Sequence, residues 1–106
     1  MTILHLALAD DWADAEKAGE YRVSTLGRTL EEEGYIHACA DLDQLRGVAE
    51  RYYTGVTAPL AVLTVDQALL DCPVIFEVPP GADEAFPHIY GPLPVEAVVA
   101  VSPFPG

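Results

Sequence analysis

The sequence has few basic residues, few cysteines and no long apolar run. Among its 106 residues, 17 are acidic and only five are Lys or Arg, so the formal net charge is −12 at pH 7. A surface of that sign repels phosphate groups, and we therefore expect neither a nucleic acid nor an anionic membrane as a partner. The acidic surface either attracts a soluble partner that is neutral or cationic, or only keeps the protein soluble.

Cys39 and Cys72 are too few for a disulfide framework, which favours a reducing compartment. The first residues lack a basic segment, and no stretch is apolar for long enough to span a membrane. These absences predict a cytoplasmic protein. Apolar residues make up 51% of the chain, so one domain, residues 1–106, can build a core without metal or disulfide bonds.

The clearest secondary-structure pattern is a helix from Leu42 to about Tyr53. Its apolar residues recur at helical spacing, which places Leu45 and Val48 toward the core. Asp41 is a good N-cap, and Gln44 follows three residues later, as a capping box requires.

A second helix is expected after an N-cap at Asp10 or Asp11. Short strands are predicted at residues 3–8, 34–40, 60–65, 74–78 and 95–101, whereas residues 20–29 show little periodicity. Two main helices and five or six strands in irregular order predict an α+β fold with a small mixed β-sheet.

The most distinctive stretch is Phe86–Pro94. Three prolines and a glycine restrict its backbone. His88 and Tyr90 are two residues apart, so they share one face if the segment is extended. The stretch therefore predicts either a stiff segment that presents an imidazole and a phenol to a ligand, or a rigid loop whose side chains bond to the protein itself.

Other polar side chains on strand-like segments are His5, His37 and Glu77. Burying three imidazoles separately would need three sets of partners, because an unpaired buried polar group costs about 1–3 kcal/mol. We therefore predict that His5, His37 and His88 line one cavity, with Tyr90 at its wall or rim. Histidines in such a cavity can donate hydrogen bonds or transfer protons. For His5, a core histidine with its own partners remains the alternative.

Three imidazoles and a carboxylate could also bind zinc or non-haem iron. Their spacings match no local metal signature, so we expect no stoichiometric transition metal. Cys39 precedes a helix N-terminus, which can lower a thiol pKa, so it is either a nucleophile or a small buried residue. No Gly-x-Ser-x-Gly, Gly-x-Gly-x-x-Gly or phosphate-binding Gly-Lys-Ser/Thr loop occurs, which leaves hydrolase, dinucleotide-fold and kinase interpretations unsupported.

Three segments carry a family resemblance: Leu4-His5-Leu6-Ala7, Gly34-Tyr35-Ile36-His37 and Phe86–Pro94. Together they resemble an uncharacterised bacterial family, domain-of-unknown-function family 952, over almost the whole chain. That family is distantly similar to the ADP-ribosyltransferase superfamily, whose members clamp NAD in a split, strongly twisted β core. The resemblance therefore implies an ADP-ribosyltransferase-like fold, with NAD or a related nucleotide as the cofactor.

The resemblance also implies an active site with one residue from each of three strands. His5 would take the first position and hold the adenosine-side ribose, with Tyr90 also contacting the nucleotide. The segment from His37 to Cys39 would take the second position, with His37 as its catalytic residue. Glu77 or His88 would take the third and stabilise an oxocarbenium-like transition state. The competing interpretation is a non-enzymatic module for small-ligand binding or protein interaction, since only five basic residues could meet a pyrophosphate.

Overall fold

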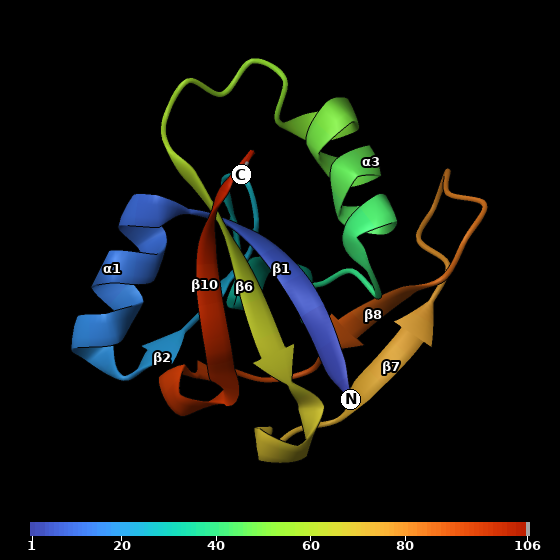
Figure 1. Ribbon diagram of the computed structural model, residues 1–106. Helices are drawn as coiled ribbons and strands as arrows, with labels where there is room; N and C mark the ends of the chain where they lie inside the picture. The colour runs from blue at the N-terminus through green and yellow to red at the C-terminus, as the bar shows by residue number, and fades with distance from the viewer. Residues whose placement is uncertain (106) are drawn as a thin grey trace.

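Two three-stranded antiparallel sheets hold most of the β structure. The computed structural model describes residues 1–105. One sheet has the strand order β1-β6-β10 and the other β5-β8-β7. Figure 1 shows β6 between β1 and β10, with α1 and α3 on either side of this sheet. The strands are β1 (Thr2–Leu8), β5 (Ile36–His37), β6 (Leu60–Asp66), β7 (Val74–Glu77), β8 (Phe86–Ile89) and β10 (Val98–Phe104).

Shorter elements connect these sheets. Residues 20–29 contain three short strands. These strands are too short to produce a detectable alternation of apolar and polar residues, so the sequence did not predict them. Strand β2 pairs with β9, and β3 pairs with β4. The remaining elements are α1 (Ala9–Ala18), β2 (Glu20–Tyr21), β3 (Val23–Thr25), β4 (Arg28–Thr29), α2 (Leu30–Glu33), α3 (Leu42–Tyr52), η1 (Gln67–Leu69), β9 (Leu93–Pro94) and η2 (Val95–Ala97).

The α+β class and the two longer helices are confirmed, but the predicted mixed sheet is wrong. Every strand pair in the described part of the chain is antiparallel. Strands β1 and β6 pair from Leu8↔Leu60 to Thr2↔Asp66. The segment between them brings the chain back to the end of the sheet where β1 finishes, so β6 runs antiparallel to β1. No helix within residues 1–105 is long and apolar enough to cross a membrane.

The chain passes between the two sheets directly after β5. Ala38 N donates to Pro87 O of the second sheet at 3.0 Å. Leu4 N donates to Cys39 O at 2.8 Å, and Cys39 N donates to Leu4 O at 2.7 Å, which forms a single bridge to β1. The residue before this crossing, His37, is therefore held close to both sheets.

Helix α3 begins as predicted. The Asp41 side chain accepts a hydrogen bond from Gln44 N at 2.9 Å, and Leu45 and Val48 are buried. The Gln44 carboxamide reaches Ala40 N rather than the N-cap amide, so only half of a capping box forms.

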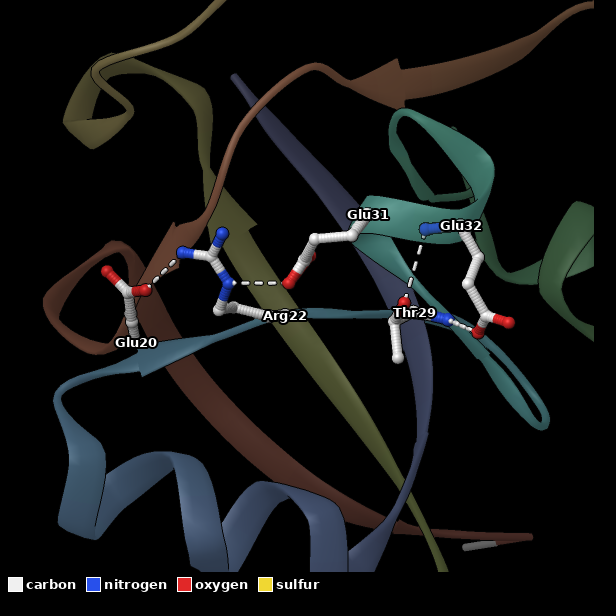
Figure 2. Close-up of polar contacts among 5 residues, drawn as sticks. All are labelled: Glu20, Arg22, Thr29, Glu31 and Glu32. Atoms are coloured by element: carbon white, nitrogen blue, oxygen red, sulfur yellow. Dashed lines mark hydrogen bonds and ion pairs between the residues drawn. The ribbon is translucent and has the colours of Figure 1, made fainter.

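The other two helices begin differently from each other. Leu8 occupies the N-cap position of α1 without a side-chain cap, so the predicted caps Asp10 and Asp11 lie inside the first turn. Carboxylates there still interact favourably with the helix dipole. In α2, Thr29 and Glu32 form a complete capping box, which Figure 2 shows as two reciprocal bonds.

Strand β1 separates two apolar clusters because its side chains alternate between its faces. Ile3 and Ala7 pack in the cluster beside α1, whereas Leu6 packs in the cluster beside α3. His5 lies on the same face as Ile3 and Ala7, two residues from each. The pattern of β1 therefore directs His5 into the core.

Candidate functional site

Imidazole and phenol side chains collect on one face of the β5-β8-β7 sheet. His37 and His88 pair directly across β5 and β8, and their ring centroids are 5.7 Å apart. The Tyr35 ring stacks on His88 at 3.9 Å with an interplanar angle of 12°, and it lies 5.6 Å from the Tyr90 ring. The structure thus brings together two of the three predicted histidines and Tyr90, with Tyr35 between them.

Glu77 joins this group from β7. Its Oε1 atom accepts hydrogen bonds from His88 Nδ1, at 2.7 Å, and from the Tyr90 hydroxyl. The bond from Tyr90 and then that from His88 hold the pKa of Glu77 below its usual value, and the same contact raises the pKa of Tyr90 to about 12. Glu77 is therefore an ionised carboxylate at neutral pH. Its side chain is 41% exposed, so water also reaches it.

A carboxylate oxygen only accepts hydrogen bonds, so Nδ1 of His88 must carry a proton. The other ring nitrogen, Nε2, is buried and has no hydrogen-bond partner among residues 1–105. Of the candidate site residues, His88 is thus the one that combines a carboxylate partner with an unpaired ring nitrogen.

A cavity of about 310 Å³ lies in front of His37. Burial and then the nearby His88 lower the pKa of His37 to about 4, so its ring is neutral at pH 7. His88 does not line this cavity, but its ring lies beside the rings of two residues that do, Tyr35 and His37. The lining residues are Thr25, Leu26, Glu33, Tyr35, His37, Tyr52 and Pro79.

Of the three histidines predicted to line one cavity, only His37 does so, and Tyr90 is not among the lining residues either. The prediction is therefore wrong for His88 and Tyr90, and it is also wrong for His5. Its side chain is buried, Nδ1 donates to the His37 carbonyl oxygen at 2.6 Å, and Nε2 accepts from the Tyr21 hydroxyl at 2.9 Å. Burial lowers the pKa of His5 to about 4. His5 is instead the alternative considered for it, a core histidine with its own partners.

The Tyr21–His5 bond can be tested by stability. Tyr21→Phe keeps the ring but removes the hydroxyl, which leaves Nε2 of His5 buried and unpaired. We expect the free energy of unfolding to fall by about 1–3 kcal/mol in urea denaturation. The matched control is Tyr52→Phe, at a ring that is 63% exposed, where the change should stay within about 0.5 kcal/mol. Equal losses in both variants would contradict the assigned bond.

Cys39 is not a candidate nucleophile. It is 2% exposed, and burial raises the pKa of its thiol to about 12, so the thiol stays protonated. Of the two interpretations of Cys39, the small buried residue is the one that fits, because desolvation outweighs the helix dipole. Within residues 1–105, no group of three or more His, Cys, Asp or Glu side chains is arranged to bind a metal ion.

Of the residues that line the cavity, only His37 was singled out as a site residue from the sequence, and the two tyrosines were missed. Tyr35 precedes His37 by two residues, the same spacing that drew attention to His88 and Tyr90, so that signal was present. Tyr52, the last residue of α3, is exposed and lines the cavity. Its neighbour Tyr53 is buried instead, with its hydroxyl accepting from Leu26 N at 3.2 Å.

No Lys or Arg side chain lines the cavity. Arg28 Nη2 pairs with Glu33 at 2.9 Å, on the carboxylate that contributes to the lining. Arg22 forms ion pairs with Glu20 at 2.5 Å and with Glu31 at 3.1 Å, as Figure 2 shows. The cavity therefore offers aromatic faces, one neutral imidazole and one carboxylate, but no cationic group for an anion.

Comparisons with known proteins give a family and a fold. The model of a family described as protein of unknown function (DUF952) matches residues 6–101. The crystal structure of protein CC0527 from Caulobacter crescentus, a structural genomics target, is 25% identical, with a TM-score of 0.79 over 97% of this chain and 85% of that one. Its solution NMR structure gives 25% identity and a TM-score of 0.75 over 95% and 82% of the two chains. The comparison with curated proteins gave no match.

Proposed function

This chain belongs to the DUF952 family of proteins of unknown function, and we propose that it binds a small uncharged or cationic molecule in the cavity in front of His37. One observation carries the proposal: the cavity has the tyrosine rings of Tyr35 and Tyr52 in its walls and no cationic side chain. Aromatic faces attract cations and other rings. The net charge of −12 attracts a cation to the protein and repels an anion.

His37 supplies a polar anchor for such a ligand. A neutral imidazole carries one donor and one acceptor nitrogen, so it can bond to a hydroxyl, an amide or an amine. Its backbone is fixed by side chains, because His37 N donates to Ser24 Oγ at 3.2 Å and His37 O accepts from His5. His5 thus contributes to the site as a positioning residue rather than as a ligand contact.

An NMR titration with three probes that share one ring tests the proposal: benzylamine, benzamide and benzoate. The cation and the neutral amide should shift the amide signals of residues around the cavity, and benzoate should not. Tyr52→Ala should weaken benzylamine binding between about threefold and thirtyfold, the range of a cation–π contact. Leu69→Ala, at a side chain exposed outside the cavity, is the control. Equal binding of benzoate, or full affinity in Tyr52→Ala, would contradict the proposal.

A second candidate is transfer or cleavage at the nicotinamide–ribose bond of NAD, as in an ADP-ribosyltransferase-like enzyme. Glu77 favours it, because an ionised carboxylate beside the His88 and Tyr90 side chains could stabilise an oxocarbenium-like transition state. It ranks second because both ring nitrogens of His5 are engaged with the protein, and no basic side chain lines the cavity to meet a pyrophosphate. Calorimetry with NAD decides, since no heat and no thermal shift would remove this candidate.

A further inference from the structure

His88 is a buried histidine with one ring nitrogen committed and the other unused. Its side chain is 3% exposed, Nδ1 donates to Glu77 Oε1 at 2.7 Å, and Nε2 has no partner. Buried polar atoms in native proteins almost always have a hydrogen-bond partner, so an unpaired nitrogen requires an explanation. The other buried histidine, His5, shows that this fold can satisfy both ring nitrogens.

We propose that His88 is the acid–base group of this site and that its Nε2 atom accepts a proton from a hydroxyl or amine of the bound ligand. The proton leaves the ligand O–H or N–H, the electron pair stays on the oxygen or nitrogen, and a new N–H bond forms at Nε2. The ligand takes the proton back when the step reverses or the product leaves. This proposal rests on the ligand site in front of His37 and specifies the chemistry of that ligand.

Glu77 is the group that stabilises the product of this proton transfer. When Nε2 takes a proton, the imidazole becomes a cation whose Nδ1–H already points at an ionised carboxylate. In a Ser-His-Asp triad the carboxylate likewise fixes the histidine tautomer and stabilises the imidazolium. The Tyr90 hydroxyl holds the same Glu77 oxygen in position. His5 bonds to a neutral carbonyl at its Nδ1 and lacks such a counter-charge.

The cavity provides the approach to His88. Tyr35 and His37 both line the cavity, and both of their rings lie beside the His88 ring, so His88 is a neighbour of the cavity lining. Tyr35 is only partly buried, and its ring is held by stacking on His88 and by its proximity to Tyr90. Tyr35 covers the face of the imidazole, and the proposal requires this ring to move aside so that a ligand donor reaches the ring edge that carries Nε2.

Carbethoxylation with diethyl pyrocarbonate, mapped by mass spectrometry, reads out unprotonated ring nitrogens in the free protein. We expect His37 to react, His5 to stay unreactive, and His88 to react faster by about tenfold or more in Tyr35→Ala. Glu77→Gln should slow the reaction at His88 by about tenfold, roughly the factor of one charge-assisted hydrogen bond. Glu96→Gln, at an exposed glutamate of η2, is the matched control, and an unreactive His5 shows that each variant is folded. An inert His88 in Tyr35→Ala, or no effect of Glu77→Gln, would overturn the proposal.

A matched pair of probes separates this inference from the proposed ligand site. Benzyl alcohol has the hydroxyl that the proposal requires, whereas benzyl methyl ether lacks the donor. The alcohol should protect both His37 and His88 from carbethoxylation, and the ether should protect His37 alone. If the alcohol also protects only His37, the role of His88 is overturned while the ligand site stands. If neither probe protects His37, the ligand site itself is contradicted, and the role of His88 with it.

Discussion

Replacing Leu45 with Ala should lower the free energy of unfolding by about 2–5 kcal/mol. The Leu45 side chain is 0% exposed and packs in the cluster between α3 and β1, together with Leu6, Val62 and Phe86. Its truncation removes buried apolar surface and leaves a cavity that the surrounding side chains fill only in part. Urea denaturation followed by far-UV circular dichroism measures the change.

Leu42→Ala is the matched control for this prediction, since it removes the same atoms from the same helix. The Leu42 side chain is 42% exposed, so its truncation should cost less than about 1 kcal/mol. A loss well under 1 kcal/mol for Leu45→Ala would show that the buried face of α3 is misassigned. Comparable losses of unfolding free energy in Leu45→Ala and Leu42→Ala would also show that the buried face of α3 is misassigned.

Acid should destabilise the folded protein well above the pH at which its carboxylates titrate. Burial holds the pKa of His5 and of His37 at about 4, whereas an unfolded histidine titrates near 6.5. Between these values the unfolded chain binds more protons than the folded one, so stability falls as the pH falls. From pH 7 to pH 4.5 the loss should be on the order of 2 kcal/mol for each of the two histidines.

Urea denaturation at pH 7, 6 and 5 measures this dependence. Near pH 5 the slope should correspond to about two protons taken up on unfolding, one for each histidine. In His37→Gln the slope should fall to about one proton. Glu32 and Glu77, whose pKa values are lowered by hydrogen bonds, contribute only as the pH falls below their unfolded pKa, which lies below this range. An unchanged slope in His37→Gln would contradict the assigned burial of that ring.

Features that depend on neighbouring residues could be predicted from the sequence. Helix α3 was located because its apolar spacing is helical and because Asp41 and Gln44 lie at its N-terminus. The long strands β1 and β6 are continuous apolar segments, which periodicity detects without knowledge of their partners. The segment containing His88 and Tyr90 was found because its prolines make it unusual. In each case the signal lies within about ten residues of chain.

Features that depend on pairing between segments far apart in the chain could not be predicted from the sequence. Strand β2 has two residues and exists because β9, some 70 residues later, lies beside it. The position of His5 depends on Tyr21, a residue in a segment without periodicity, so the sequence could not tell a cavity histidine from a core histidine. The contact between Glu77 and His88 follows from the register of β7 and β8, which the hydrophobic pattern of two short strands does not determine.

Strand β5 is short, and side chains rather than a neighbouring backbone hold its outer edge. On one edge it pairs with β8, and on the other the His5 imidazole and the Ser24 hydroxyl bond to the backbone of His37. A peptide spanning residues 34–53 would carry Tyr35, His37 and Tyr52 but none of these three attachments. The binding surface therefore cannot be transplanted as a linear segment, and a graft onto another scaffold would have to reproduce partners from three other parts of the chain.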